Sequence, residues 1–326
     1  MRIALTTTVP LEPLFAGGHT PVDLNNIFIN DKYPRAFVDK AHEAGFPRSL
    51  CAWIKAQHTV LTLENFDAVI AVSTGDCSNT NALMELVSDR GGRVHNFSYI
   101  REPGTFRREF EKFCAFLGVS IKEAEDEFRR LLPLRKKLAS LDALTVAGFV
   151  TGEENHSWLV SSSDFWGDKE RFDRELSVFL SEAEKRSAFC PPVRLGFVGV
   201  PPIITDLYKQ VRELGADFFF NEVQHQFMIP SECPDMLGRY LDYTYPYDIF
   251  GRLEDITTAV RERKLHGIVH YVQSFCHRQI QDMILRKRLS VPVLTLEGDG
   301  PAPLDERSKI RLESFVEMLA AKNGEC

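Results

Sequence analysis

Residues 67–79, Asp-Ala-Val-Ile-Ala-Val-Ser-Thr-Gly-Asp-Cys-Ser-Asn, contain the pattern that decides the fold. The run at 67–72 is apolar and rich in β-branched residues. Turn residues follow it, and a helical pattern begins at residue 81 after two capping candidates, Asn79 and Thr80. A strand with helices over both faces has no polar side, so this run is typical of a buried parallel strand. Residues 2–7 form a second run of the same kind.

The alternation of strands and helices continues along the chain. Amphipathic helical patterns at 32–44 and 54–63 separate the first two strands. In the second half, four further strands are predicted, at 194–200, 217–221, 267–272 and 291–296. Such alternation predicts the α/β class, here as two doubly wound, Rossmann-like domains with parallel sheets and additional helices.

The middle of the chain is expected to be helical and to contain the domain boundary. Residues 106–141 have a helical pattern with a break near Gly118, and Ser120 followed by Glu123 is a capping-box candidate that restarts the helix. The clearest loop, at 161–168, precedes another helical pattern. A chain of 326 residues also exceeds the roughly 250 to 300 residues of a single core. We therefore expect an N-terminal domain at 1–165 and a C-terminal domain at 166–326.

Composition excludes several classes of protein. No apolar run approaches the ~20 residues that cross a bilayer, and the first residues lack the apolar core of a secretory signal, which favours a cytoplasmic protein without a membrane anchor. The net charge of −7 argues against a nucleic-acid-binding protein, which needs a basic face to displace counterions.

Three cysteines stand at positions suited to chemistry. Cys77 and Cys276 each lie on the turn between a predicted strand and the following helical pattern, and Cys51 also stands at the start of such a pattern. Backbone N–H groups and the helix N-terminus stabilise a thiolate at such turns. The chain has seven cysteines and no CxxC pair, so in a reducing cytosol they are expected to be thiols unless chemistry uses them.

Spacing alone leaves other interpretations open. A free cysteine is often a buried structural residue. Structural zinc prefers four ligands in closely spaced pairs, whereas these cysteines are scattered, with His277 as the nearest fourth candidate. A cysteine hydrolase needs a thiol, a histidine and an orienting group, and the side chains of the neighbours Cys276 and His277 usually diverge.

Four segments carry a resemblance to a known family: Gly-Gly-His-Thr-Pro-Val-Asp-Leu at 17–24, Thr-Gly-Asp-Cys at 74–77, His-Tyr-Val-Gln-Ser-Phe-Cys-His-Arg-Gln-Ile at 270–280, and Pro-Val-Leu-Thr-Leu-Glu-Gly-Asp at 292–299. Together they resemble the 2-hydroxyacyl-CoA dehydratase family, whose relatives include the benzoyl-CoA reductase subunits and the double-cubane cluster proteins. The resemblance covers essentially the whole chain.

The resemblance implies a 4Fe-4S cluster in the cleft between the domains. Its three cysteine ligands map onto Cys51, Cys77 and Cys276, which leaves one iron open. The remaining cysteines, Cys114, Cys190, Cys233 and Cys326, fall outside the family motifs. The double-cubane branch needs about twice as many ligands, so the resemblance favours a single cluster.

The resemblance also implies partners. Family members receive a low-potential electron from a separate ATP-hydrolysing iron-sulfur activator, and this sequence has no phosphate-binding loop of its own. The electron drives radical dehydration or reduction of an acyl-CoA thioester, in a dimer with itself or with a related subunit. A different class remains open, an electron-relay or scaffold subunit without an acyl-CoA site. The segment around Cys276 departs from the one expected in the best-known dehydratases. The substrates of those enzymes are therefore not assigned to this chain.

Two further residues are candidates for catalysis. His277 follows Cys276 directly and is placed to hydrogen-bond to cluster or substrate, although a histidine at a helix start is as often a cap or a surface residue. Glu297 follows the last predicted strand, where a carboxylate can relay protons. The alternative for Glu297 and nearby Asp299 is turn chemistry, in which Asp and Gly supply the bend.

Overall fold

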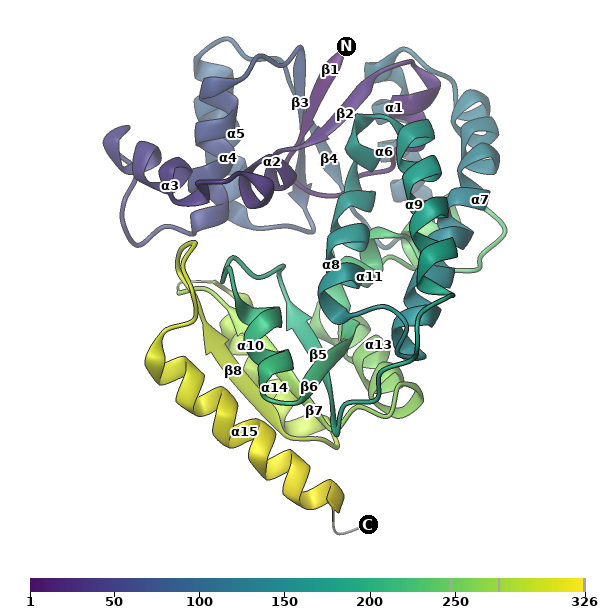
Figure 1. The fold of residues 1–326 in the computed structure, drawn as a ribbon. Coiled ribbons are helices and arrows are strands. Elements are labelled where there is room, and N and C mark those ends of the chain that lie inside the picture. Colours follow the sequence, from purple (N-terminus) through teal and green to yellow (C-terminus); the bar gives the residue numbers. More distant parts are fainter. Residues whose placement is uncertain (247, 275, 325–326) are drawn as a thin grey trace. The chain divides into compact units, whose positions relative to one another are not determined.

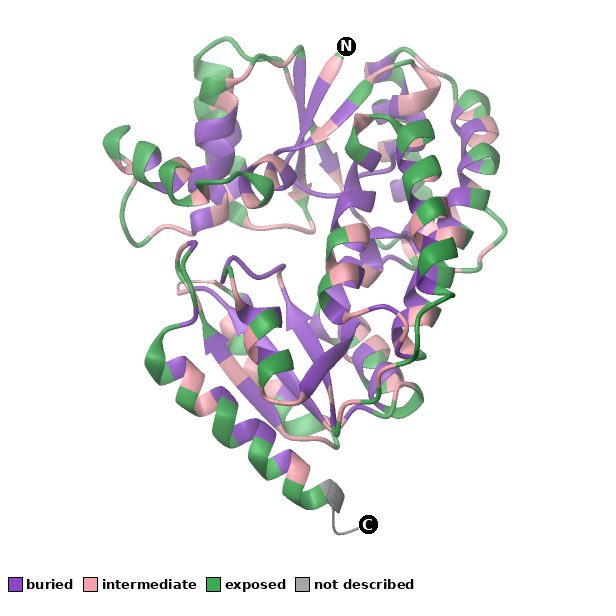
Figure 2. Ribbon diagram, in the orientation of Figure 1, coloured by how far each residue is buried: buried purple, intermediate pink, exposed green. Residues whose placement is uncertain are grey.

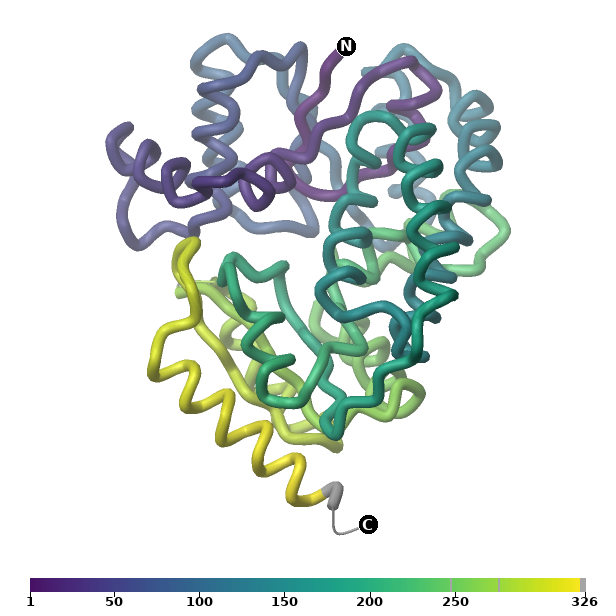
Figure 3. The backbone as a smooth tube through the Cα atoms, viewed as in Figure 1, coloured from purple at the N-terminus to yellow at the C-terminus, as the bar shows by residue number. Residues whose placement is uncertain are grey.

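The computed structural model describes residues 1–246, 248–274 and 276–324, and it divides into two compact units. Unit 1 consists of Met1–Ala139, Val160–Ser177 and Gln226–Asp248. Unit 2 consists of Ser140–Leu159, Val178–His225 and the chain from Ile249 onward. The chain therefore changes unit several times along its path (Figure 3).

Unit 1 is built on a four-stranded parallel sheet with the order β2-β1-β3-β4. Its strands are β1 (Arg2–Leu5), β2 (Thr20–Asp23), β3 (Ala68–Thr74) and β4 (Val94–Ser98). The predicted strands at 2–7 and 67–72 are confirmed as β1 and β3. The two edge strands, β2 and β4, had not been predicted, because each is only partly buried and so lacks a continuous apolar run.

Unit 2 contains a second four-stranded parallel sheet, with the order β6-β5-β7-β8. Its strands are β5 (Val193–Gly199), β6 (Ala216–Asn221), β7 (Gly267–Val272) and β8 (Val293–Glu297). All four had been predicted to within two residues at each end. The two sheets share one order, in which the first strand has the second on one side and the third on the other. The α/β class with two Rossmann-like sheets is confirmed.

Helices flank both sheets (Figure 1). In chain order they are α1 (Glu12–Ala16), α2 (Leu24–Asn30), α3 (Pro34–Glu43), α4 (Ala52–Leu63), α5 (Ser78–Asp89), α6 (Pro103–Leu117), α7 (Ile121–Val146), α8 (Gly152–Val160), α9 (Lys169–Ala183), α10 (Leu207–Glu213), α11 (Glu222–Phe227), α12 (Met236–Leu241), α13 (Ile249–Glu262), α14 (Arg278–Arg288) and α15 (Glu306–Gly324), with 3₁₀ turns η1 (Ser161–Ser163) and η2 (Phe165–Gly167) before α9. In unit 1, α4 contacts α5 and α1 contacts α6.

The predicted helix break is present and has a physical cause. Gly118 ends α6 in the left-handed region at φ 73°. The capping box that starts α7 is confirmed: the Ser120 N–H donates to Glu123 at 2.7 Å, and the Glu123 N–H donates to the Ser120 hydroxyl at 3.2 Å. The two bonds satisfy backbone donors that the first turn of a helix leaves unpaired.

The core of each unit lies between its sheet and the helices. In Figure 2 strands β5 and β6 are coloured almost entirely as buried, whereas β2 includes exposed and intermediate residues. Ala4, Val69 and Ala71 pack with residues of α4 and α5 in unit 1, and Val198 and Ile268 pack with α13 in unit 2. Among the described helices, none has the length and apolarity that a membrane crossing requires.

Candidate functional site

Both sheets have a topological switch point at their carboxyl edge. The chain leaves β1 toward β2 and returns in β3 on the other side, and β5, β6 and β7 repeat this arrangement. In open α/β sheets, ligands bind in the crevice outside the carboxyl ends of the strands at such a point. Cys77 follows β3, and Cys276 follows β7. The two thiols therefore occupy equivalent positions in the two units.

Cys77 is the N-cap residue of α5, with extended backbone angles of φ −70° and ψ 138°. The Thr80 N–H donates to the Cys77 carbonyl at 3.0 Å, which opens the first turn of the helix. The predicted caps Asn79 and Thr80 were wrong, because the helix begins at Ser78 and includes both residues. As the N-cap residue, Cys77 has its half-buried thiol at the positive end of the α5 dipole, where a thiolate is favoured.

The turn before Cys77 is shaped by Gly75. Its φ of +104° lies in the region that favours glycine, and an added Cβ would lie 2.5 Å from the Pro246 Cβ and 3.2 Å from the Tyr99 Cβ. The Tyr99 N–H also donates to the Thr74 carbonyl at 3.0 Å. Asp76 accepts a long bond of 3.4 Å from the Thr80 hydroxyl, consistent with a role in the turn.

Cys51 has the same position on the neighbouring helix of unit 1. It is the N-cap residue of α4, and the Lys55 N–H donates to its carbonyl at 3.2 Å. Its side chain is half-buried. The Lys55 ammonium is buried and donates to the Arg48 carbonyl at 2.8 Å, so it also fastens the segment before Cys51. Cys51 and Cys77 thus stand at the N-termini of two helices that contact each other.

Cys276 lies in a tight turn between β7 and α14. Its N–H donates to the Gln273 carbonyl at 3.1 Å, and its carbonyl accepts from the Gln279 N–H at 3.0 Å. The thiol is half-buried. The Gly298 N–H donates to the Val272 carbonyl at 3.1 Å. This bond corresponds to the one from Tyr99 to Thr74 in unit 1, since each joins the residue after the fourth strand to the last residue of the third.

The predicted catalytic residues flank Cys276 in unit 2. His277 is exposed, and its pKa is lowered, first because the surrounding chain partly desolvates the ring and then because Arg278 and Arg252 add positive charge. Glu297, the last residue of β8, is exposed and accepts from the Gln279 amide at 3.3 Å. Their catalytic roles stay predictions.

Nearly the whole sequence matches one known family. The family model described as 2-hydroxyglutaryl-CoA dehydratase, D-component, matches residues 6–319, which is nearly the whole chain. The chain belongs to this family. A search of curated proteins finds no match. The resemblance seen in the sequence motifs is therefore confirmed at the level of the D-component family.

The other cysteines of this member of the D-component family have different surroundings. Cys114 is buried in α6, and burial, with smaller contributions from Glu111 and Glu12, raises the pKa of its thiol to about 12. A thiol that resists ionisation is a poor metal ligand. Cys190 is exposed and Cys233 is half-buried, and Cys326 lies outside the described residues.

The donor chemistry of the three candidate cysteines fits an iron-sulfur cluster. All three side chains are half-buried. Cys51 and Cys77 are helix N-cap residues, and Cys276 lies two residues before α14. A thiolate is favoured near a helix N-terminus, and thiolates are the ligands of such clusters. Within the described part of either unit, no group of three or more His, Cys, Asp and Glu side chains is arranged to hold a metal ion. Cys51 and Cys77 belong to unit 1, and Cys276 belongs to unit 2.

A buried ion pair, which sequence reasoning missed, supports the carboxyl edge of the second sheet. Glu222 follows β6 directly and pairs with Arg252 of α13 at 2.6 Å. Burial alone would raise the pKa of Glu222, but the Arg252 guanidinium holds it below its ordinary value. Glu222 also accepts from the Gly199 N–H at 2.9 Å, and Arg252 donates to Gln281 of α14 at 2.6 Å. The only sequence signal was an acidic residue directly after a strand.

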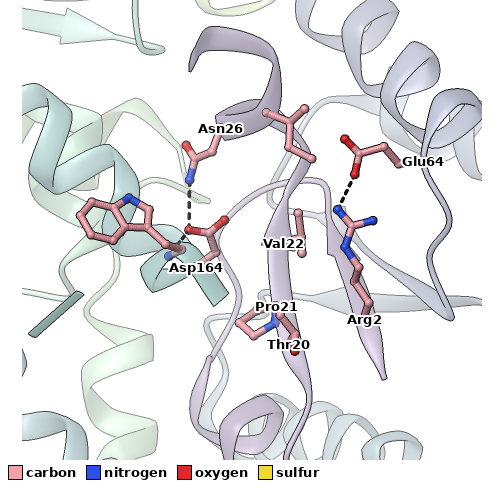
Figure 4. Close-up of a pocket in the computed structure, with 9 residues that line it drawn as sticks. Arg2, Thr20, Pro21, Val22, Asn26, Glu64 and Asp164 are labelled. Carbon is pink, nitrogen blue, oxygen red and sulfur yellow. Dashed lines mark hydrogen bonds and ion pairs between the residues drawn. The ribbon is translucent and has the colours of Figure 1, made fainter. Parts of the chain in front are cut away.

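Unit 1 also contains a pocket of about 400 Å³ beside β2, with Asp164 in its wall (Figure 4). The Asp164 carboxylate accepts from the Asp23 N–H at 2.8 Å and from the Trp166 N–H at 2.9 Å. These bonds stabilise an unusual turn, because Phe165 and Trp166 both have positive φ. Burial and the neighbouring Asp23 carboxylate raise the pKa of Asp164 to about 7.

The raised pKa of Asp164 predicts that the free energy of unfolding falls as the pH rises from acidic to neutral values. Asp164 titrates near 7 in the folded chain and near 3.8 without its surroundings, so the folded state holds the extra proton between those values. One pKa unit corresponds to about 1.4 kcal/mol, so the Asp164 contribution to the free energy of unfolding should fall by about 2–3 kcal/mol from pH 5 to 7 and then level off. Urea unfolding of the metal-free protein at several pH values measures this change.

The matched variant is Asp23→Asn, which keeps an acceptor for the Asn25 N–H and removes the charge beside Asp164. Its unfolding free energy should depend less on pH across the same window. If the unfolding free energies of the two proteins depend equally on pH, the charge of Asp23 does not raise the pKa of Asp164, and the prediction is wrong.

Proposed function

We propose that this chain is the iron-sulfur subunit of an enzyme that dehydrates or reduces an acyl-CoA thioester, with a 4Fe-4S cluster on Cys51, Cys77 and Cys276. The family match supports a dehydratase component. The observation that carries the proposal is the equivalent placement of Cys77 and Cys276, each in the turn that follows the third strand of its sheet at the switch point.

The three turns supply the conditions that such a centre needs. Helix N-termini favour thiolates and so favour tight ligation. Three thiolates holding a four-iron cluster would leave one iron without a protein ligand, available to water or substrate. When bound, the cluster supplies electrons at low potential, since its potential is set by ligation, burial and hydrogen bonds within a range that reaches about −700 mV.

Two residues beside Cys276 have suitable proton chemistry. The lowered pKa of His277 keeps its ring neutral at pH 7, so one ring nitrogen accepts a hydrogen bond while the other donates one. Glu297 is exposed and able to exchange protons with solvent. In the proposed reaction, His277 orients a substrate oxygen, and Glu297 relays the proton that leaves with hydroxide as water.

A separate activator is part of the proposal. A low-potential electron needs an energy source, and the sequence contains no G-x-x-x-x-G-K-[ST] loop for ATP. An ATP-hydrolysing iron-sulfur protein that docks transiently would supply the electron. The catalytic assembly would be a dimer of this chain with itself or with a related subunit.

The test is anaerobic reconstitution with iron and sulfide, followed by metal analysis and electron paramagnetic resonance after reduction by an activator with ATP. About four irons and four sulfides per chain are expected for a single cubane. About eight irons would place the protein with the double-cubane proteins, and zinc or no metal would overturn the proposal.

A second measurement separates a catalytic subunit from an electron relay. A panel of 2-hydroxyacyl-CoA thioesters is added to the reduced protein, and the resonance spectrum and the loss of water are followed. A substrate-dependent change in the spectrum with formation of an enoyl-CoA supports the catalytic assignment. An unchanged spectrum with every thioester, in the presence of the cluster, favours the relay.

A further inference from the structure

The turn that carries Cys276 is fastened by one carboxylate from the loop after β8. Asp299 accepts the Ser274 N–H on one oxygen at 2.6 Å and the Ser274 hydroxyl on the other, also at 2.6 Å. Both oxygens of the carboxylate are therefore used on a residue two positions before Cys276. Hydrogen bonds to an ionised acceptor are shorter and stronger than neutral ones.

The loop that presents Asp299 is itself held against β7. The Gly298 N–H donates to the Val272 carbonyl at 3.1 Å, and the Gly298 carbonyl accepts from the Tyr271 hydroxyl at 2.8 Å. An added Cβ on Gly298 would lie 3.0 Å from the Tyr271 ring. These contacts hold the backbone directly before Asp299 against β7.

Fixing Ser274 restricts Cys276, because Cys276 is hydrogen-bonded to Gln273, the residue directly before Ser274. The Cys276 N–H is bonded to the Gln273 carbonyl, and the Cys276 carbonyl is bonded to the Gln279 N–H. The segment is therefore held at Ser274 by Asp299 and at its far end by the first turn of α14, which Gln279 also ties to Glu297. A thiol in a segment held at both ends has little freedom to leave a bound metal.

The equivalent turn in unit 1 is held in a different way. There the Ser73 hydroxyl lies 3.1 Å from the Ser98 hydroxyl, and Gly75 is enclosed by Pro246 and Tyr99. These contacts are neutral and steric. At the turn of Cys276 the carboxylate comes from another segment, because Asp299 lies after β8. At the turn of Cys77 the carboxylate of Asp76 belongs to the turn itself and accepts from the Thr80 hydroxyl at 3.4 Å.

We propose that Asp299 is a positioning residue for Cys276, and that its two bonds to Ser274 set how firmly this thiol holds iron. The inference rests on the proposed function for its metal and extends it to a residue that does not touch the metal itself. Because Asp299 bonds to a residue two positions before Cys276, a centre held by that thiol would have the negative charge of this carboxylate nearby, and such charge favours a low reduction potential.

The clamp is tested first in the metal-free protein by hydrogen exchange. In Asp299→Ala, the amides of Ser274, Cys276 and Gln279 should exchange about tenfold faster or more, because the two bonds to Ser274 are lost. The matched control is Asp305→Ala, which removes another aspartate of the same connection, one that caps α15 through the Ser308 N–H at 3.0 Å. In the control these three amides should exchange as in the unchanged protein.

The effect on the metal is tested in the reconstituted protein. Iron release to a chelator should be about tenfold faster in Asp299→Ala than in Asp305→Ala, and the midpoint potential should rise. Ser274→Thr keeps both donors and should retain slow release, while Ser274→Ala keeps only the N–H and should give an intermediate rate. Equal release rates for Asp299→Ala and Asp305→Ala would overturn the inference.

The two measurements also separate this inference from the proposed function. If the unchanged protein binds no iron, the proposed function fails, whereas the exchange measurement still reports whether Asp299 holds the turn. If iron binds and depends on Cys276 but is insensitive to Asp299, the proposed function stands and the positioning role is wrong.

Discussion

Cys51→Ala, Cys77→Ala and Cys276→Ala are each expected to leave the reconstituted protein without its iron, its labile sulfide and its brown colour. A cubane held by three thiolates and one exchangeable ligand has no spare protein ligand, so the loss of one leaves a centre that solvent and chelators dismantle. Iron and sulfide per chain, measured anaerobically after desalting, should fall from about four to near zero.

The controls for this prediction come from the same chain. Cys114→Ala and Cys233→Ala should retain full iron, because Cys114 is buried with a pKa of about 12 and Cys233 is not among the three cysteines that the family resemblance gives as ligands. Cys114→Ala should cost no more than about 1–2 kcal/mol of stability, as for a small truncation in a core. A Cys276→Ala protein with unchanged iron content would contradict the ligand assignment.

Gly75→Ala is expected to disrupt the Cys77 turn and destabilise unit 1. The substitution combines two penalties: a left-handed backbone at φ +104° and a Cβ placed 2.5 Å from the Pro246 Cβ. The backbone term is about 1–2 kcal/mol, and overpacking adds about 1–3 kcal/mol. The free energy of unfolding should therefore fall by about 2–5 kcal/mol in urea, and iron binding should weaken because Cys77 is displaced.

Gly45→Ala isolates the backbone term. Gly45 also has positive φ, at +95°, but an added Cβ would meet nothing within 4 Å. This variant should lose only about 1–2 kcal/mol and should bind iron normally. If the two glycine variants lose equal stability, the contact with Pro246 does not constrain the turn.

Much of the fold could be read from local pattern. β1, β3 and the four strands of unit 2 are buried and apolar, so each appears in the sequence as a continuous run. The edge strands β2 and β4 could not be read in this way, because a partly exposed strand mixes polar and apolar residues. The helix at Cys77 was placed three residues late, since a cysteine is not among the preferred caps.

The residues of the candidate site also fall into two groups, those visible in one segment of sequence and those that depend on contacts between distant segments. Cys51, Cys77 and Cys276 could be singled out because a cysteine at the start of a helical pattern is visible in one segment of sequence. The clamp from Asp299 to Ser274 and the pair of Glu222 with Arg252 join segments 25 and 30 residues apart, and no local pattern marks which residue meets which.

Local sequence pattern was thus enough to predict the α/β class, the central strands and the cysteines near helix starts, because hydrophobic periodicity and turn residues depend on a few neighbours along the chain. The equivalence of Cys77 and Cys276 became visible in the folded chain, because the order β2-β1-β3-β4 and its repeat in unit 2 depend on pairing between strands that are distant in the sequence. The tertiary structure also decided the protonation of Asp164, since a carboxyl group acquires a pKa of about 7 only when folding buries it beside Asp23.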